Sequence, residues 1–237
     1  MSRGLITCFS QGGTTARVSE QISAGLVSAG HEVDTCNLKD KTPPEIGAYD
    51  FLGLGLPVYA FTPPFNVTEY LEGLPRLPGL PFFVFVLYGT YRGDAGTRAR
   101  RALEKKGGRE VGYFYCRGVD YFINYLKSGY LFSAGHPDSD ELAGAKNFGL
   151  QVASHLAGSP YDRPEDDPPP GLVYRLERFL LNRWLTRQFY SRLFWVNKKS
   201  ATTAASVSNS APPGTSRRTN PATRSGAAAV WAAGTAK

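Results

Sequence analysis

Short apolar runs alternate with one-sided amphipathic segments along the first two thirds of the chain. The strand-like runs are Leu5–Phe9, His31–Leu38, Tyr49–Leu56, Leu80–Tyr88 and Glu110–Cys116. The segments with helical spacing are Thr15–Ala29, Asn66–Gly73, Asp94–Lys106 and Asp138–Leu156. The third run is almost wholly apolar, which is typical of a strand buried on both faces. This alternation predicts an open five-stranded parallel α/β sheet with ligands at the carboxyl ends of its strands.

The turn after the first run has the composition of a phosphate-binding loop. It reads Ser10, Gln11, Gly12, Gly13, Thr14 and Thr15. Glycines let an anion approach backbone N–H groups, the threonines add hydroxyl donors, and the start of a helix favours negative charge. An ordinary glycine turn with a Ser/Thr cap would give the same pattern, so the turn alone leaves both interpretations open.

Two further loops should meet this turn, because the sheet predicts that the ends of its first, third and fourth strands lie together. They are residues 57–64 and 88–93, and both are rich in aromatic and turn residues. Tyr59, Phe61, Tyr88 and Tyr91 can line a flat slot beside the phosphate site. Each aromatic taken singly is better explained by packing, but four on two converging loops favour a planar ligand with a phosphate tail.

Length, charge and apolar content argue against a nucleic-acid-binding, membrane-spanning or secreted protein. The 237 residues suffice for one domain with a buried core. The net charge of +7 is mostly a tail effect, since residues 1–195 hold 21 Lys/Arg against 20 Asp/Glu and residues 196–237 hold 6 Lys/Arg and no acid. A nearly neutral body argues against a nucleic-acid surface. No apolar run is long enough for a membrane span and the start does not fit a secretory signal, so we expect a cytoplasmic protein.

The three cysteines, Cys8, Cys36 and Cys116, each lie inside an apolar run. That placement suits reduced core thiols better than a disulfide framework or a metal site. We therefore expect no metal bound by these residues.

Residues 1–157 resemble flavodoxin domains, in particular those of the "ferrodoxin" family, in which a flavodoxin-like domain is fused to a ferredoxin domain with 4Fe-4S clusters. Five stretches carry the resemblance: Phe-Ser-Gln-Gly-Gly-Thr-Thr at 9–15, Gly-Leu-Pro-Val-Tyr-Ala-Phe-Thr-Pro-Pro at 55–64, Tyr-Gly-Thr-Tyr-Arg-Gly at 88–93, Leu-Glu-Lys-Lys-Gly-Gly at 103–108 and Gly-Tyr-Leu-Phe-Ser-Ala-Gly-His-Pro at 129–137. The resemblance implies strand order 2-1-3-4-5, helices on both faces and bound FMN.

By this resemblance the FMN phosphate lies at residues 10–15 and the isoalloxazine ring at the other two loops. The implied ring contacts are Pro57, Val58, Tyr59, Ala60, Phe61, Tyr88, Gly89, Thr90, Tyr91 and Gly93. Gly12 departs from the family pattern, because it stands where a threonine hydroxyl is usual. Losing one hydrogen bond to a charged group costs about 1.5–3 kcal/mol, so we expect weaker phosphate binding and not its loss.

The remainder of the chain has three segments of different composition. Residues 158–171 form an acidic, proline-rich linker that cannot be helix or sheet throughout. Residues 172–199 read as a helical connector whose part 172–195 is basic and aromatic. Such a helix can lie on a membrane surface, although we favour packing on a neighbouring domain. Residues 200–237 read as a disordered tail.

A second pattern emerges when the codons that could encode the tail are considered. Codons for residues 200–221 can be chosen so that the neighbouring reading frame spells C-x-x-C-x-x-C-x-x-x-C-P, the ligand spacing of a 4Fe-4S site. One base lost in the codons of 197–199 would produce the switch. Our hypothesis is that residues 200–237 are out-of-frame remnants of a ferredoxin domain, and that the chain as written has no cluster ligands; the alternative is a genuine disordered tail.

Three functions fit these observations. The first is an electron-transfer flavoprotein that exchanges electrons with redox partner proteins and, in the intact family, with 4Fe-4S clusters. The second is an FMN-dependent reductase that uses NAD(P)H and a small quinone-like acceptor. The third, weaker, is a flavodoxin-like binding module that has lost its flavin.

Overall fold

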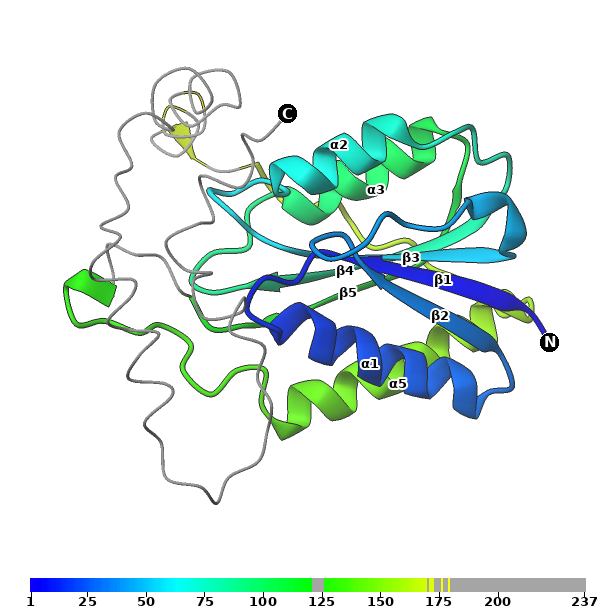
Figure 1. Cartoon of the computed structure of the whole chain (residues 1–237), viewed down its shortest axis with the longest axis horizontal. Coiled ribbons are helices and arrows are strands. Elements are labelled where there is room, and N and C mark those ends of the chain that lie inside the picture. The colour runs from blue at the N-terminus through cyan, green and yellow to red at the C-terminus, as the bar shows by residue number, and fades with distance from the viewer. Residues whose placement is uncertain (121–125, 170, 173–175, 177–178, 180–237) are drawn as a thin grey trace. The chain divides into compact units, whose positions relative to one another are not determined.

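The predicted strands and helices are present in the predicted order (Figure 1). The computed structural model describes residues 1–120, 126–169, 171–172, 176 and 179. The helices and strands belong to one unit, Met1–Phe179. The predicted connector at 172–199 and tail at 200–237 lie outside the described residues, apart from residues 172, 176 and 179.

Five parallel strands form a single sheet. They are β1 (Arg3–Cys8), β2 (Glu32–Asn37), β3 (Phe51–Pro57), β4 (Pro81–Tyr88) and β5 (Arg109–Arg117). Their order is β2-β1-β3-β4-β5, and every neighbouring pair is parallel. The predicted strand order 2-1-3-4-5 is therefore confirmed, and the ends of β1, β3 and β4 lie at one edge.

Helices cover both faces of the sheet (Figure 1). α1 (Thr14–Ser28) and α5 (Ser139–Leu156) share one apolar core with one face. α2 (Phe65–Gly73) and α3 (Ala95–Lys105) share a second core with the other face. Burial from both sides explains why β3 and β4 are almost uninterrupted apolar runs.

Glycines in β3 make room for large rings on β4. A Cβ on Gly53 would lie 2.4 Å from the Phe83 ring, and one on Gly55 would lie 2.1 Å from the Phe85 ring. Both phenylalanines are fully buried. Small residues on one central strand are therefore matched to large ones on its neighbour.

The element ends differ from the sequence predictions by small amounts. A short 3-10 turn, Ile46–Ala48, lies in the connection between β2 and β3. Asp138 caps α5 through a capping box with Glu141, as its Asp-Ser-Asp-Glu sequence indicates. Asp94 occupies the N-cap position of α3, but its side chain makes no capping hydrogen bond. None of the helices in the described part of the chain has the length and hydropathy needed to cross a bilayer.

Candidate functional site

The glycine-rich loop, residues 10–15, joins the end of β1 to the start of α1. Gly13 precedes the helix with a φ of 89°, a left-handed conformation that favours glycine. Gly12 and Gly13 are exposed, Thr14 is half-buried and Thr15 is buried. Because N–H groups at a helix start carry partial positive charge, an anion is favoured beside these two glycines.

Ser10 is buried and organises this loop from inside. Its Oγ accepts a hydrogen bond from the N–H of Ala16, at 3.0 Å, and so satisfies one N–H group of the first turn of α1. The N–H of Arg17 donates to the carbonyl oxygen of Gly13, which closes the turn. The Ser10 hydroxyl is thus a support of the loop, while the glycine backbone is its open surface.

Asn37, at the end of β2, clamps the same loop and was not predicted. Its Oδ1 accepts from the N–H of Ser10 at 3.0 Å, and its Nδ2 donates to the carbonyl oxygen of Ser10 at 3.0 Å. Nearby, Lys39 Nζ donates to the carbonyl oxygen of Gln11 at 3.4 Å. The signal was present in the strand order, because a parallel β2 beside β1 places Cys8 opposite Asn37.

The first aromatic loop, residues 57–61, contacts the glycine-rich loop. The Tyr59 hydroxyl donates to Gln11 Oε1 at 3.4 Å, and the Tyr59 ring packs edge-to-face on Phe9 with centroids 6.1 Å apart. Burial raises the pKa of Tyr59 to about 12, so its hydroxyl stays protonated at neutral pH. The backbone of Val58 donates to Leu87 on the neighbouring strand. This loop is therefore anchored on both sides.

Ala60 and Phe61 have left-handed backbone conformations, with φ values of 46° and 62°. Two hydrogen bonds of 3.0 Å between the backbones of Tyr59 and Thr62 close this tight turn. A left-handed conformation costs a non-glycine residue about 1–2 kcal/mol. Strain of this kind persists where the surroundings over-determine it, and it clusters at ligand-binding sites.

The second aromatic loop, residues 88–93, meets the first through two rings. The Phe61 and Tyr91 rings lie edge-to-face with centroids 5.5 Å apart. A planar ligand stacked between two rings needs about 7 Å, twice the contact distance between carbon atoms. One of the two rings must therefore move before a planar group can stack between them. Gly93, with a φ of 56°, lies directly beside Phe61.

The remaining residues of the second aromatic loop face other parts of the domain. The Tyr88 ring lies 6.4 Å from that of Tyr115 on β5. Gly89 accepts a hydrogen bond of 2.7 Å from Ser133, and Thr90 donates to Asp120 at 3.3 Å. A Cβ on Gly89 would lie 2.4 Å from the Asp120 side chain. These contacts fix the base of the loop and leave Tyr91 at its tip, 43% exposed.

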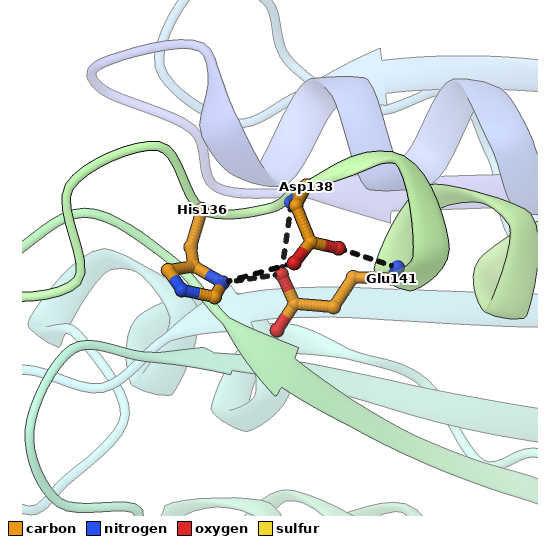
Figure 2. A group of neighbouring side chains, drawn as sticks. All are labelled: His136, Asp138 and Glu141. Atoms are coloured by element: carbon orange, nitrogen blue, oxygen red, sulfur yellow. Dashed lines mark hydrogen bonds and ion pairs between the residues drawn. The ribbon is translucent and has the colours of Figure 1, made fainter.

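A separate group, His136, Asp138 and Glu141, gathers at the start of α5, and Figure 2 shows the three side chains pointing toward one another. Their potential ligand atoms lie within 4.8 Å of one another. However, Glu141 Oε2 accepts from the N–H of Asp138 and lies 2.8 Å from His136 Nδ1, while its Oε1 accepts from the N–H of Arg117. Both carboxylate oxygens are thus engaged, and the group serves as a helix cap.

Two hollows lie beside α2 and not between the aromatic loops. Their volumes are about 530 and 440 Å³, and they share Thr42, Pro43, Glu69 and Tyr70 in their linings. Lys39, whose Nζ donates to Gln11 of the glycine-rich loop, lines the larger one. Between the aromatic loops, the Phe61 and Tyr91 rings are in contact.

No protein-family model matches the sequence, and no curated protein matches it significantly. The fold, in contrast, is similar to that of several solved structures. A flavodoxin from the domain Archaea is 15% identical with a TM-score of 0.52, covering 65% of this chain and 99% of that one. Two-electron reduced flavodoxin from Megasphaera elsdenii is 19% identical with a TM-score of 0.50, covering 64% and 98%. Oxidised flavodoxin 1 from Bacillus cereus is 16% identical with a TM-score of 0.52, covering 65% and 99%. About two thirds of the chain therefore has the flavodoxin fold.

Proposed function

We propose that this protein binds FMN at the three converging loops and transfers electrons. One observation carries the proposal: the glycine-rich loop at the start of α1 is joined by direct contact to a strained aromatic loop, and that loop to a second aromatic tip. An anion site beside two aromatic rings matches the two ends of a flavin mononucleotide. The flavodoxin fold is in accord with this assignment.

The glycine-rich loop fits the phosphate end. Gly12 and Gly13 expose backbone next to the positive end of α1, and Asn37 holds that backbone in place. Lys39 brings a full positive charge to Gln11 in the same loop. At an exposed site one such charge contributes about 1 kcal/mol to binding an anion.

The aromatic loops fit the ring end. Phe61 and Tyr91 offer flat apolar surfaces from opposite loops once one of the two rings, which contact each other edge-to-face, has moved aside. Bound FMN supplies one- and two-electron transfer. Because Tyr91 is exposed at the tip of its loop, the ring end is the part of the site that a redox partner protein can approach. This arrangement favours a carrier of electrons over a catalyst with a buried substrate site.

Titration of the cofactor-free protein with FMN and with riboflavin tests the proposal. Saturable quenching of flavin fluorescence is expected with both, and tighter binding with FMN because only FMN has the phosphate. Lys39→Met should weaken FMN about fivefold and leave riboflavin unchanged, whereas the control Lys41→Met should change neither. Absence of quenching by either flavin would overturn the proposal. Steady NAD(P)H oxidation with a quinone would favour a reductase instead.

The proposal extends to the part of the chain beyond the described residues. If the chain derives from the flavodoxin–ferredoxin fusion family, residues 200–237 are out-of-frame remnants of a cluster-binding domain. The support for this is that codons for 200–221 can be chosen so that the neighbouring frame spells four cysteines at 4Fe-4S spacing. The coding DNA decides it: a single-base change in the codons of 197–199 must restore the cysteines, and if none does, the idea is wrong.

A further inference from the structure

Residues 161–167, named the strap, were predicted to belong to a linker but lie against α3 and β5. They contain no helix or strand. The buried guanidinium of Arg100 on α3 donates to the carbonyl oxygens of Pro164, at 2.9 Å, and Glu165, at 3.4 Å. The Tyr161 hydroxyl donates to Glu110 on β5 at 2.6 Å. The strap is therefore fastened to the domain by hydrogen bonds from elements far away in sequence.

A buried ion pair anchors the first half of the strap. Arg100 is fully buried, and its Nε lies 2.9 Å from both carboxylate oxygens of Glu110. Arg163 adds a second charge, with its Nε 2.9 Å from Glu104 and 3.3 Å from Glu110. Both members of the buried pair also contact the strap, since Arg100 donates to the carbonyl oxygens of Pro164 and Glu165 and Glu110 accepts from the Tyr161 hydroxyl.

Asp167 ends the strap as a buried carboxylate with partners from three elements. Its Oδ1 lies 2.8 Å from Arg92 Nη2, its Oδ2 accepts from the Tyr113 hydroxyl, and its N–H donates to Thr97 Oγ1 at 2.7 Å. Burial and the hydrogen bond to Asp167 raise the pKa of Tyr113, which keeps this hydroxyl a donor. Gly96 leaves the space that the Tyr113 hydroxyl occupies.

Arg92 connects Asp167 to the second aromatic loop. It stands between Tyr91, whose ring contacts Phe61, and Gly93. Its guanidinium lies over the Tyr115 ring, 3.7 Å from the centroid, and among the described residues its buried Nη1 has no hydrogen-bond partner. Asp167 thus supplies the carboxylate that holds this arginine, and through it the loop tip.

We propose that Asp167 is a positioning residue, which holds the second aromatic loop through Arg92 and so couples attachment of the strap to cofactor binding. The coupling to cofactor rests on the proposed FMN site; the control of the loop does not. Because coupling between two sites is reciprocal, a ligand at the aromatic loops should also tighten the strap. A change in how the strap is attached would then alter the flavin site through Arg92.

Asp167→Asn and Asp162→Asn form a matched test in the full-length protein. Asp162 is an exposed carboxylate of the same strap, so its loss should matter little. Asp166 would not be a neutral control, because its carboxylate lies 2.6 Å from Arg101, 3.0 Å from Arg163 and 3.6 Å from the buried Arg100. In cofactor-free protein, Asp167→Asn should raise the hydrogen-exchange rate of the amides at 88–93 about tenfold, while Asp162→Asn leaves it within about twofold. FMN should bind about tenfold more weakly to Asp167→Asn only.

Arg92→Gln provides the second variant if Asp167→Asn does not fold, because Arg92 is partly exposed. It should reproduce the faster exchange. The double variant should exchange only slightly faster than either single variant, because both substitutions break the same contact. Unchanged exchange at 88–93 in either single variant overturns the proposal, as does an equal effect of Asp162→Asn. Failure of the wild-type protein to bind FMN would refute the proposed function alone, since the exchange measurement needs no ligand.

Discussion

Asn37 offers a sharp test of the glycine-rich loop, because all four atoms that its amide engages are known. Its Oδ1 accepts from the N–H groups of Ser10, at 3.0 Å, and Lys39, at 3.2 Å. Its Nδ2 donates to the Ser10 carbonyl and to Asp40 Oδ2, both at 3.0 Å. Asn37→Asp keeps the shape and both accepted bonds, but it loses both donated bonds and opposes two carboxylates.

The size of the effect follows from these contacts. Each lost hydrogen bond contributes a net of about 0.5–1.5 kcal/mol, so two contribute about 1–3 kcal/mol. Two carboxylates about 4 Å apart repel by about 1 kcal/mol in water. Asn37→Asp should therefore lower the free energy of unfolding by about 2–4 kcal/mol. FMN affinity should fall by at least about tenfold, because the loop that faces the phosphate loses its clamp.

Urea unfolding and FMN titration measure the two quantities. The double variant Asn37→Asp/Asp40→Asn exchanges the two groups, so the amide at position 40 can donate to the carboxylate at position 37. It should recover about two thirds of the lost stability, since the repulsion is relieved and only the bond to the Ser10 carbonyl stays broken. A single variant within about 0.5 kcal/mol of wild type, with unchanged FMN affinity, would refute the role given to the clamp.

Three other predictions address the loop, the buried pair and pH. Gly12→Thr should tighten FMN binding about tenfold by adding a hydroxyl donor, and the backbone can accept it because φ at Gly12 is not left-handed. Gly13→Thr should weaken binding, because φ at Gly13 is 89°. FMN titration of the two variants compares these effects. Glu110→Gln should cost up to about 3–5 kcal/mol in urea unfolding, because it leaves buried Arg100 with the more distant Asp166 carboxylate, at 3.6 Å; a cost below about 1 kcal/mol would contradict the anchoring of the strap. Burial, together with Glu110, raises the pKa of Tyr161, so the tyrosine releases its proton at a lower pH in the unfolded chain than in the folded one. The free energy of unfolding should therefore fall as pH rises above about 10. Tyr161→Phe should make this fall less steep in urea unfolding measured from about pH 8 to 11.

The sequence determined the order and type of the elements, because each depends on a local pattern. β3 and β4 are apolar along nearly their whole length since both faces are covered, and that run is visible without partners. The capping box at Asp138 lies within four residues, so its sequence alone predicted the start of α5. The glycine-rich loop was predicted for the same reason.

The polar contacts that hold the site were decided by tertiary structure. Asn37 stands 27 positions from Ser10, and the partners of Asp167 lie on α3, β5 and the second aromatic loop. A polar residue in a proline-rich segment reads as linker, because composition does not show which distant donors face it. Six of the seven strap residues are charged or proline, and yet Asp167 is buried.

The aromatic loops were also predicted in part from sequence and decided in part by tertiary structure. Their composition and their place after β3 and β4 predicted convergence, because parallel strands end at one edge of a sheet. Only the folded chain shows that Phe61 and Tyr91 touch, that Ala60 and Phe61 have left-handed backbones, and that Tyr88 packs on Tyr115 instead. Hydrophobic periodicity fixes which strands form, whereas loop conformation depends on contacts between residues that no local pattern relates.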